Sequence, residues 1–277
     1  MKPLDKFIPE MLSDENAKRI LSEKQYMDFS IMSVEERDAN LRELLTHPIG
    51  KFTAINELYF RSKWAELFER FYKNKPFTLL EIASGDADMI PQTMSITNPT
   101  SNYFTANMNV KLNESLLKKT SMLNIKLRLI DDDAANIKQY IPEKSVHMIA
   151  FQHGANDVMQ AILCGQNEID TTYSDWMKTL PKMIELLQAE VNNGTFEEHV
   201  KCSFLTLISD LLDLLTEDGV IAINHYMFRL DLDWGYPPEL FENIVPIVRG
   251  WCSELESAKE VSVDGYDSQW WIFLKKQ

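Results

Sequence analysis

The chain has 277 residues and a formal net charge of -14, from 42 acidic and 28 basic residues. Its lysines and arginines form no cluster, so a phosphate backbone would be repelled at long range. This balance argues against DNA, RNA and anionic membranes as partners. Three widely spaced cysteines, with no Cys-x-x-Cys and no clustered histidines, indicate neither a disulfide framework nor a metal site.

The first residues, Met1 to Lys6, lead into no apolar core of a signal peptide. No apolar run approaches the length that is needed to span a bilayer. We therefore expect a cytoplasmic protein. With 45% hydrophobic residues the chain can bury a large core, either as one elaborated domain or as a domain plus a cap.

Residues 1–75 are predicted to be helical. Ser33-Val-Glu-Glu36 has the spacing of a capping box and opens a helix that should stop near His47-Pro48. After Gly50, apolar residues recur at steps of three and four and predict a longer helix, which Asn74-Lys-Pro76 ends. We interpret this block as an N-terminal helical cap.

Strand-like and helix-like runs alternate from residue 77 onward, which is the pattern of a parallel sheet covered on both faces. The expected strands begin at Phe77 and continue with 102–107, 125–133, 145–152, 219–225, 259–263 and 269–274. The last two form a terminal hairpin. The expected helices lie near 87–97, 110–122, 133–140, 155–163, 200–216 and 238–252. An insertion, residues 165–199, interrupts the alternation and contains a predicted helix from Asp175 to Val191.

The segment Phe77 to Met89 carries the clearest chemical signal, because an apolar run breaks abruptly into small and acidic residues. This pattern predicts a strand, a tight turn and a helix start, where a nucleotide-like ligand meets backbone N–H groups and a helix N-terminus. Gly85 lets the backbone pass close to a ligand, and Ala83 and Ser84 keep bulky side chains away from it.

Glu81 and Asp86 place carboxylates where a pyrophosphate would be disfavoured, so the turn suits a cationic or neutral group. The pattern apolar-Leu-Glu-Ile-Ala-Ser-Gly-Asp resembles the first motif of class I S-adenosylmethionine-dependent methyltransferases. The resemblance covers residues 77–277, with the motifs in the order of that family. It implies an α/β fold: a doubly wound, Rossmann-like, seven-stranded and mostly parallel sheet over residues 76–277, with S-adenosylmethionine as cofactor.

The resemblance also implies residues that bind the cofactor. After the second strand the family normally has an acid that holds the ribose hydroxyls, whereas this sequence has Asn107, followed by Met108 and Asn109. After the third strand, Asp133 with Ala134 best matches the element that binds adenine, and Asp132 is the fallback. Capping of the next helix is the alternative role for these acids.

Two polar clusters follow the fourth and fifth strands. Gln152 and His153 end the fourth strand on the cofactor side, and Asp157 follows one helical turn later. His225 and Tyr226 end the fifth strand. Because histidine titrates near neutrality, either histidine is a candidate base for the methyl acceptor, with Asp157 orienting His153. A structural role for each histidine is the open alternative.

Aromatic and basic residues outside the strand ends complete the candidate site. In similar enzymes a residue of the cap touches the methionine end of the cofactor, so Tyr59 and Arg61 are candidates. Trp176 and Trp234 are candidate walls of an acceptor pocket, since an indole excludes water and can hold a cation. Trp270 and Trp271 are expected in the core.

The sequence thus predicts a methyltransferase that acts on a hydroxyl, amine or carboxylate of a small molecule. Two alternatives stay open. A dehydrogenase would share the strand-turn-helix start, but Gly85 lacks the companion glycines of Gly-x-Gly-x-x-Gly. An inactive, methyltransferase-like scaffold protein is the stronger alternative, because of Asn107 and Ala87. A homodimer is also left open.

Overall fold

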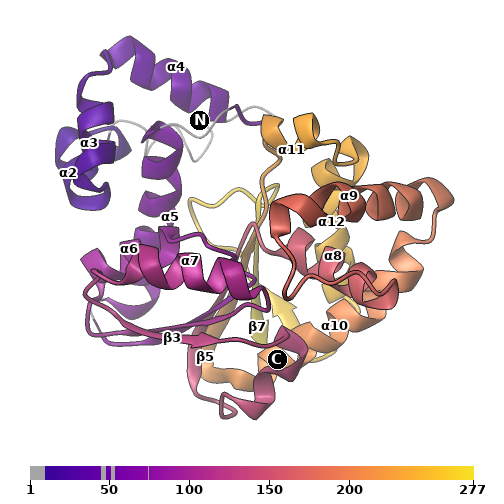
Figure 1. Cartoon of the computed structure of the whole chain (residues 1–277). Helices are drawn as coiled ribbons and strands as arrows, with labels where there is room; N and C mark the ends of the chain where they lie inside the picture. Colours follow the sequence, from indigo (N-terminus) through magenta and orange to yellow (C-terminus); the bar gives the residue numbers. More distant parts are fainter. Residues whose placement is uncertain (1–9, 45–47, 51–53, 74) are drawn as a thin grey trace.

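The computed structural model describes residues 10–44, 48–50, 54–73 and 75–277. Its centre is one seven-stranded sheet in the order β3-β2-β1-β4-β5-β7-β6 (Figure 1). The strands are β1 (Thr78–Ile82), β2 (Asn102–Ala106), β3 (Lys126–Ile130), β4 (Val146–Gln152), β5 (Leu215–Asn224), β6 (Ala258–Glu260) and β7 (Trp271–Lys276). β1 to β5 pair in parallel, and β7 runs antiparallel to both β5 and β6. The predicted seven-stranded, mostly parallel sheet is confirmed.

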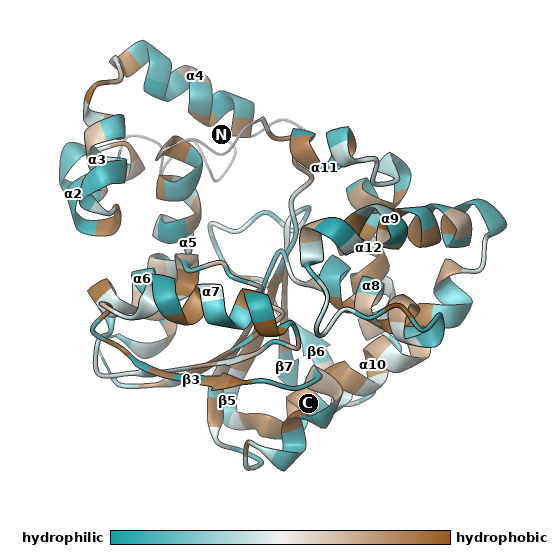
Figure 2. Ribbon diagram, viewed as in Figure 1, coloured by the Kyte–Doolittle hydropathy of each residue, from teal (hydrophilic) through white to brown (hydrophobic). Residues whose placement is uncertain are grey.

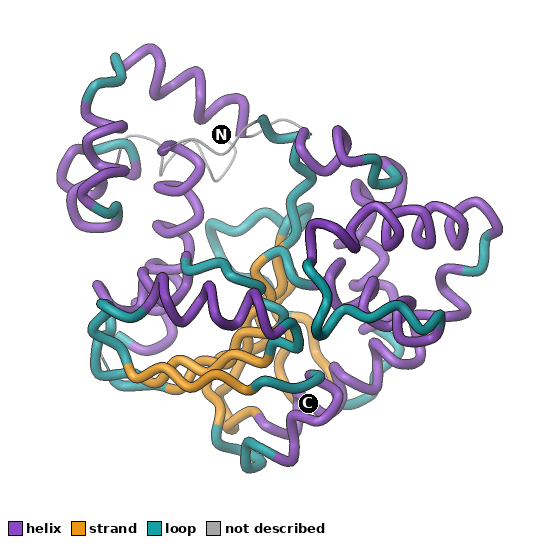
Figure 3. Tube along the Cα trace, in the orientation of Figure 1, coloured by secondary structure: helices purple, strands orange, loops and turns teal. Residues whose placement is uncertain are grey.

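Helices cover both faces of this sheet, so that the strands lie between helical layers (Figure 3). They are α2 (Asp14–Ile20), α3 (Glu23–Ser30), α4 (Val34–Leu44), α5 (Ala54–Tyr72), α6 (Met89–Thr97), α7 (Val110–Thr120), the 3-10 helix η1 (Ala134–Gln139), α8 (Ala155–Gln166), α9 (Trp176–Asn193), α10 (Phe196–Leu214), α11 (Arg229–Trp234) and α12 (Pro238–Cys252).

Two apolar cores lie on opposite faces of the sheet, because side chains alternate along each strand. In β1, Leu80 and Ile82 belong to the core under α8, α10 and α12, whereas Leu79 belongs to the core under α5 and α6. Figure 2 shows α4 and β6 mainly in the hydrophilic colour. Within the described part of the chain, no helix is long and apolar enough to cross a membrane.

The helix α5 packs flat on the sheet through aromatic side chains. The rings of Phe60 and Tyr226 lie 4.6 Å apart, and those of Trp64 and Trp271 lie 5.3 Å apart. Both pairs meet edge to face, a favourable arrangement of aromatic rings. The same core continues into α2, α3 and α4. The division of the chain into a helical cap, residues 1–75, and a sheet domain, residues 76–277, stays a prediction.

Local signals located most of the helices. Ser33 and Glu36 form the predicted capping box at the start of α4, with reciprocal bonds of 2.7 and 3.2 Å. The predicted helix end at His47 and the predicted stop at Asn74 lie outside the described residues. α10 begins at Phe196 and β5 at Leu215, each four residues earlier than predicted. β5 starts early because Leu215 pairs with Val146 across an irregularity in the register.

Candidate functional site

A cavity of about 930 Å³ opens at the carboxyl ends of the first three strands. Its floor is formed by the loops after β1, β2 and β3, and its opposite wall by α8, α9, α10 and α11. The strand order reverses at β1, which pairs with β2 on one side and β4 on the other. Ligands of open α/β sheets bind at this switch point, and the volume lies at the upper end for small-molecule sites.

The turn after β1 forms the part of the cavity nearest the sheet. Ala83 and Gly85 have positive φ angles of 55° and 57°, in the left-handed region that favours glycine. Ser84 bonds to Thr105 of β2 at 2.8 Å between the two hydroxyl oxygens, which ties the turn to the next strand. A Cβ on Gly154 would lie 2.7 Å from the carbonyl oxygen of Ile82, so glycine is required there too.

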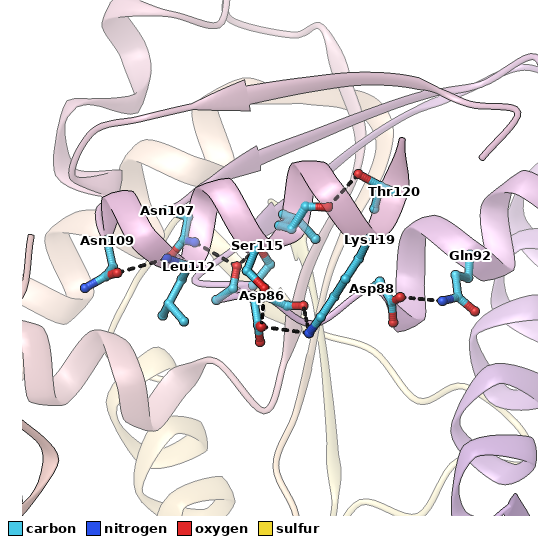
Figure 4. Close-up of polar contacts among 12 residues, drawn as sticks. Asp86, Asp88, Gln92, Asn107, Asn109, Leu112, Ser115, Lys119 and Thr120 are labelled. Atoms are coloured by element: carbon cyan, nitrogen blue, oxygen red, sulfur yellow. Dashed lines mark hydrogen bonds and ion pairs between the residues drawn. The ribbon is translucent and has the colours of Figure 1, made fainter. Parts of the chain in front are cut away.

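Asp86 lines the cavity, and two side chains of α7 hold its carboxylate (Figure 4). Ser115 donates to Oδ2 at 2.8 Å and Lys119 donates to the same oxygen at 2.7 Å. Burial raises the pKa of Asp86, but the bonds from Lys119 and Ser115 outweigh burial and leave that pKa below its usual value. Asp86 is therefore ionised, the positive charge of Lys119 balances its negative charge, and the two bonds anchor the turn to α7.

The two asparagines after β2 are used differently (Figure 4). Asn109 accepts from the N–H of Leu112 at 3.0 Å as the N-cap of α7, and its amide donates to the carbonyls of Thr171 and Ser174. Asn107 donates both amide hydrogens inside the protein, to the carbonyl of Gly85 and to the side chain of Asn113, each at 2.8 Å. Its Oδ1 is the atom that remains for a ligand.

The acids after β3 accept hydrogen bonds from their own loop and also line the cavity. Asp132, Asp133 and Ala134 all line the cavity. Asp133 Oδ1 accepts from the N–H of Ala135 at 2.9 Å, so this side chain is also the N-cap of η1. Asp132 accepts from the hydroxyl of Tyr140, and this bond is the largest cause of its lowered pKa. The capping alternative therefore holds for Asp133 alongside its position at the cavity.

The direction of the last strands decides which doubly wound fold this is. A dinucleotide-binding sheet has the order 3-2-1-4-5-6 and parallel strands. Here β7 is inserted antiparallel between β5 and β6. This is the fold of class I S-adenosylmethionine-dependent methyltransferases. The cavity lies at the carboxyl ends of β1 to β3, where open α/β sheets bind their ligands.

Solved structures with the class I fold resemble this chain at low identity. A proposed S-adenosyl-L-methionine-dependent methyltransferase from Methanococcus maripaludis is 13% identical, with 80% of this chain and 92% of that chain covered and a TM-score of 0.48. An S-adenosylmethionine-dependent methyltransferase from Aquifex aeolicus is 12% identical, over 77% and 96% of the two chains, with a TM-score of 0.43. An rRNA methylase from Streptococcus thermophilus is 13% identical, over 78% and 95%, with a TM-score of 0.42.

At these values the likeness shows nothing about function, and the class I fold rests on the strand order itself. No protein-family model and no curated protein matches the sequence. In the described part of the chain, no group of three or more His, Cys, Asp or Glu residues could hold a metal ion.

The polar residues after β4 and β5 form a network beside the cavity. His153, with a φ of 60°, bonds through Nε2 to the carbonyl of Tyr226 at 2.6 Å. The rings of His153 and His225 stack at 4.5 Å between centroids. Asn224 donates to the side chain of Gln152 at 2.8 Å. Gln152, His153, His225 and Tyr226 all lie outside the set of residues that lines the cavity.

Asp157 is the member of this network that does line the cavity. The pKa of its carboxyl group is raised to about 6, with burial as the largest cause; the charge of His153 opposes this rise, and the negative charge of Asp231 adds to it. The amide of Asn156 donates to Asp157 Oδ1 at 3.0 Å. Asp231, whose pKa is also raised by burial, lies 3.8 Å from Nε2 of His153. The acid at ion-pair distance from His153 is thus Asp231, and the role of Asp157 in orienting His153 stays a prediction.

Three other candidates for cofactor binding lie deeper in the protein. Tyr59 is buried against Phe60, and Arg61 is buried with its guanidinium 3.1 Å from the carboxylate of Glu57. Glu81 is buried under the sheet end and accepts from the hydroxyl of Tyr103 at 2.7 Å. Burial raises the pKa of Glu81 to about 8. None of these described side chains lines the cavity.

Sequence reasoning missed the wall that faces the strand ends. Trp176 and Trp234, the predicted walls, do line the cavity. The side chains between them come from three helices and are mainly apolar: Val158, Ala161, Ile162, Met177, Ser203 and Leu207. They lie on helix faces whose periodicity predicts a core, so only their shared position against the loops identifies them as a site.

Proposed function

We propose that this protein is an S-adenosylmethionine-dependent methyltransferase whose methyl acceptor is a small molecule. The observation that carries the proposal is the cavity over the turn Ser84-Gly85-Asp86, at the switch point of a class I sheet. A Cβ at Gly85 would meet only Cδ1 of Leu112, at 3.8 Å, and both residues line the cavity. The scaffold alternative is tested by ligand binding.

The charges at the cavity suit a cationic ligand. Five aspartates line it, namely Asp86, Asp132, Asp133, Asp157 and Asp175. Lys111 is the single lysine among the described lining residues, which include no arginine, and its Nζ lies 4.0 Å from the carboxylate of Asp175. This acidity supports a sulfonium donor and disfavours RNA, whose phosphates would be repelled. The acidity of the cavity therefore supports a small-molecule acceptor in preference to RNA.

Residues of this chain would hold the methyl donor by hydrogen bonds. Asn107 Oδ1 would accept from a ribose hydroxyl, and Asp133 would accept from the adenine amino group, with Ala134 beside the ring. The donor supplies an electrophilic methyl group. The remaining work of the protein is to align the acceptor with that group and to exclude water, which the walls of α8 to α11 can do.

S-adenosylhomocysteine should bind to the purified chain and raise its melting temperature. A ligand that binds only the folded state stabilises it by about 2.7 kcal/mol at one hundred times its Kd. Calorimetry and thermal unfolding measure both effects, with NAD as the control ligand. Absence of binding of both ligands at millimolar concentration would leave only the scaffold alternative, and binding of NAD alone would point to a dehydrogenase.

Asp133→Ala should weaken binding of S-adenosylhomocysteine by about 1–3 kcal/mol, the range for a lost bond to a charged group. Because Asp133 also caps η1, Asp133→Asn is the matched variant, since asparagine is an equally good cap. Both variants should lose affinity by calorimetry, and only the alanine variant should lose stability to urea. Full affinity in both variants would move adenine binding to Asp132.

Two further properties are the location of the protein in the cell and its oligomeric state. Cys164, Cys202 and Cys252 are all free thiols, which supports the proposed cytoplasmic location, because thiols stay reduced there. A homodimer, which the sequence leaves open, is not tested by the structure of a single chain.

A further inference from the structure

The cavity has two halves of different chemistry. The half over β1, β2 and β3 carries polar loops, and the half under α8 to α11 carries apolar side chains. In the second half, Met177 and Trp234 line the cavity and yet are 56% and 42% exposed. Large apolar side chains that stay exposed at a cavity favour an apolar ligand, because its binding removes them from water.

One ionisable side chain of the first turn of α8 reaches this apolar half. Asp157 begins the helical face that continues with Val158, Ala161 and Ile162. Burial raises its pKa to about 6, which shows that its environment disfavours the charged form. The cavity-lining lysine, Lys111 of α7, has its Nζ 4.0 Å from the carboxylate of Asp175. A cation brought by a ligand would offset the cost of ionising Asp157.

We propose that the apolar half binds the methyl acceptor, and that this acceptor is an amine carried on an apolar, aromatic or aliphatic body. The identification of this ligand as the methyl acceptor rests on the proposed methyltransferase function, whereas the binding of an amine in the apolar half does not. Asp157 would hold the ammonium group, and Trp176 and Trp234 would enclose the body and present aromatic faces to the cation.

The chemistry of transfer fits this arrangement. The amine first loses a proton to the carboxylate of Asp157, which frees the lone pair on nitrogen. The N–CH₃ bond then forms as the S–CH₃ bond breaks, and sulfur keeps the bonding pair as a neutral thioether. A carboxylate acceptor would meet Asp157 with a like charge, and an alcohol would bring no positive charge to stabilise that carboxylate.

Three ligands of matched size test the class of acceptor: phenethylamine, 2-phenylethanol and phenylacetate. Calorimetry is run on the full chain, both alone and saturated with S-adenosylhomocysteine. We expect phenethylamine to bind at least tenfold more tightly than either of the other two ligands. Equal binding of the three, or a preference for phenylacetate, would overturn the inference.

The carboxylate is tested with Asp157→Asn, which keeps the shape of the side chain. This variant should lose the tenfold preference for the amine while its affinity for S-adenosylhomocysteine changes less than twofold. The control is Asp170→Asn, which also removes one negative charge but lies outside the cavity, where its carboxylate accepts from Thr172 and Tyr173. The control should keep the preference; an Asp157→Asn variant that keeps it contradicts the assignment.

The two proposals fail in different ways. If S-adenosylhomocysteine does not bind, the methyltransferase proposal falls, and the titrations without it still decide whether the apolar half prefers an amine. If S-adenosylhomocysteine binds and no preference for the amine is found, the methyltransferase proposal stands and the inference about the acceptor is wrong.

Discussion

Gly85→Val is expected to abolish binding of S-adenosylhomocysteine. Gly85 has a φ of 57°, and no protein atom lies within 3.8 Å of the position of a Cβ at this site. A branched side chain would therefore enter the cavity itself, and the left-handed backbone would add about 1–2 kcal/mol of strain. We expect at least a hundredfold loss of affinity by calorimetry, with the far-UV circular dichroism spectrum unchanged.

A second glycine serves as a control, because its replacement adds the same backbone strain without placing a side chain in the cavity. Gly194 ends α9 with a φ of 71°, and the position of its Cβ has no neighbour within 4 Å. Gly194→Val should lose a similar amount of stability to urea and keep full affinity for S-adenosylhomocysteine. If Gly85→Val binds as the wild type does, the donor site lies elsewhere on the molecule.

Glu81→Gln is expected to remove a large dependence of stability on pH. The pKa of Glu81 is raised to about 8 in the folded protein, with burial as the largest cause, against an ordinary value of 4.5. Between these values the folded state holds a proton that the unfolded state has released. The stabilisation is complete below about pH 4.5 and is lost as pH rises to about 8, with a slope of about 1.4 kcal/mol per pH unit.

Urea unfolding at several pH values measures this slope. Glutamine keeps an acceptor for the hydroxyl of Tyr103 at position 81, so the variant removes the titration and little else. The difference in unfolding free energy should move in favour of Glu81→Gln as pH rises from 5 to 8 and then stay constant. Parallel curves for the two proteins would show that Glu81 is ionised in the folded state.

The sequence alone predicted the elements of the sheet, because strands and helices follow from the local periodicity of apolar residues. It also identified the turn at Gly85, since a glycine between small residues after an apolar run has few other uses. Trp176 and Trp234 were predicted as walls of an acceptor pocket, and both line the cavity.

Residue type did not reveal which polar groups are already paired inside the protein. Asn107 and Asn109 look equivalent in sequence, but Asn109 is the N-cap of α7, with its amide donating to Thr171 and Ser174. Glu81 looks like a ligand contact, but it points into the core beside Tyr103. Except for the local bond between Leu112 and Asn109, these contacts join residues more than twenty positions apart.

The sequence by itself thus determined which segments are strands, where the chain turns sharply and how acidic the chain is. Only the tertiary structure decided that β7 lies between β5 and β6 and that Asp157 lines an apolar half of the cavity. The physical reason is the range of the forces. Periodicity and turn geometry act over a few residues, whereas the burial that raises the pKa of Asp157 to about 6 comes from helices far apart in the chain.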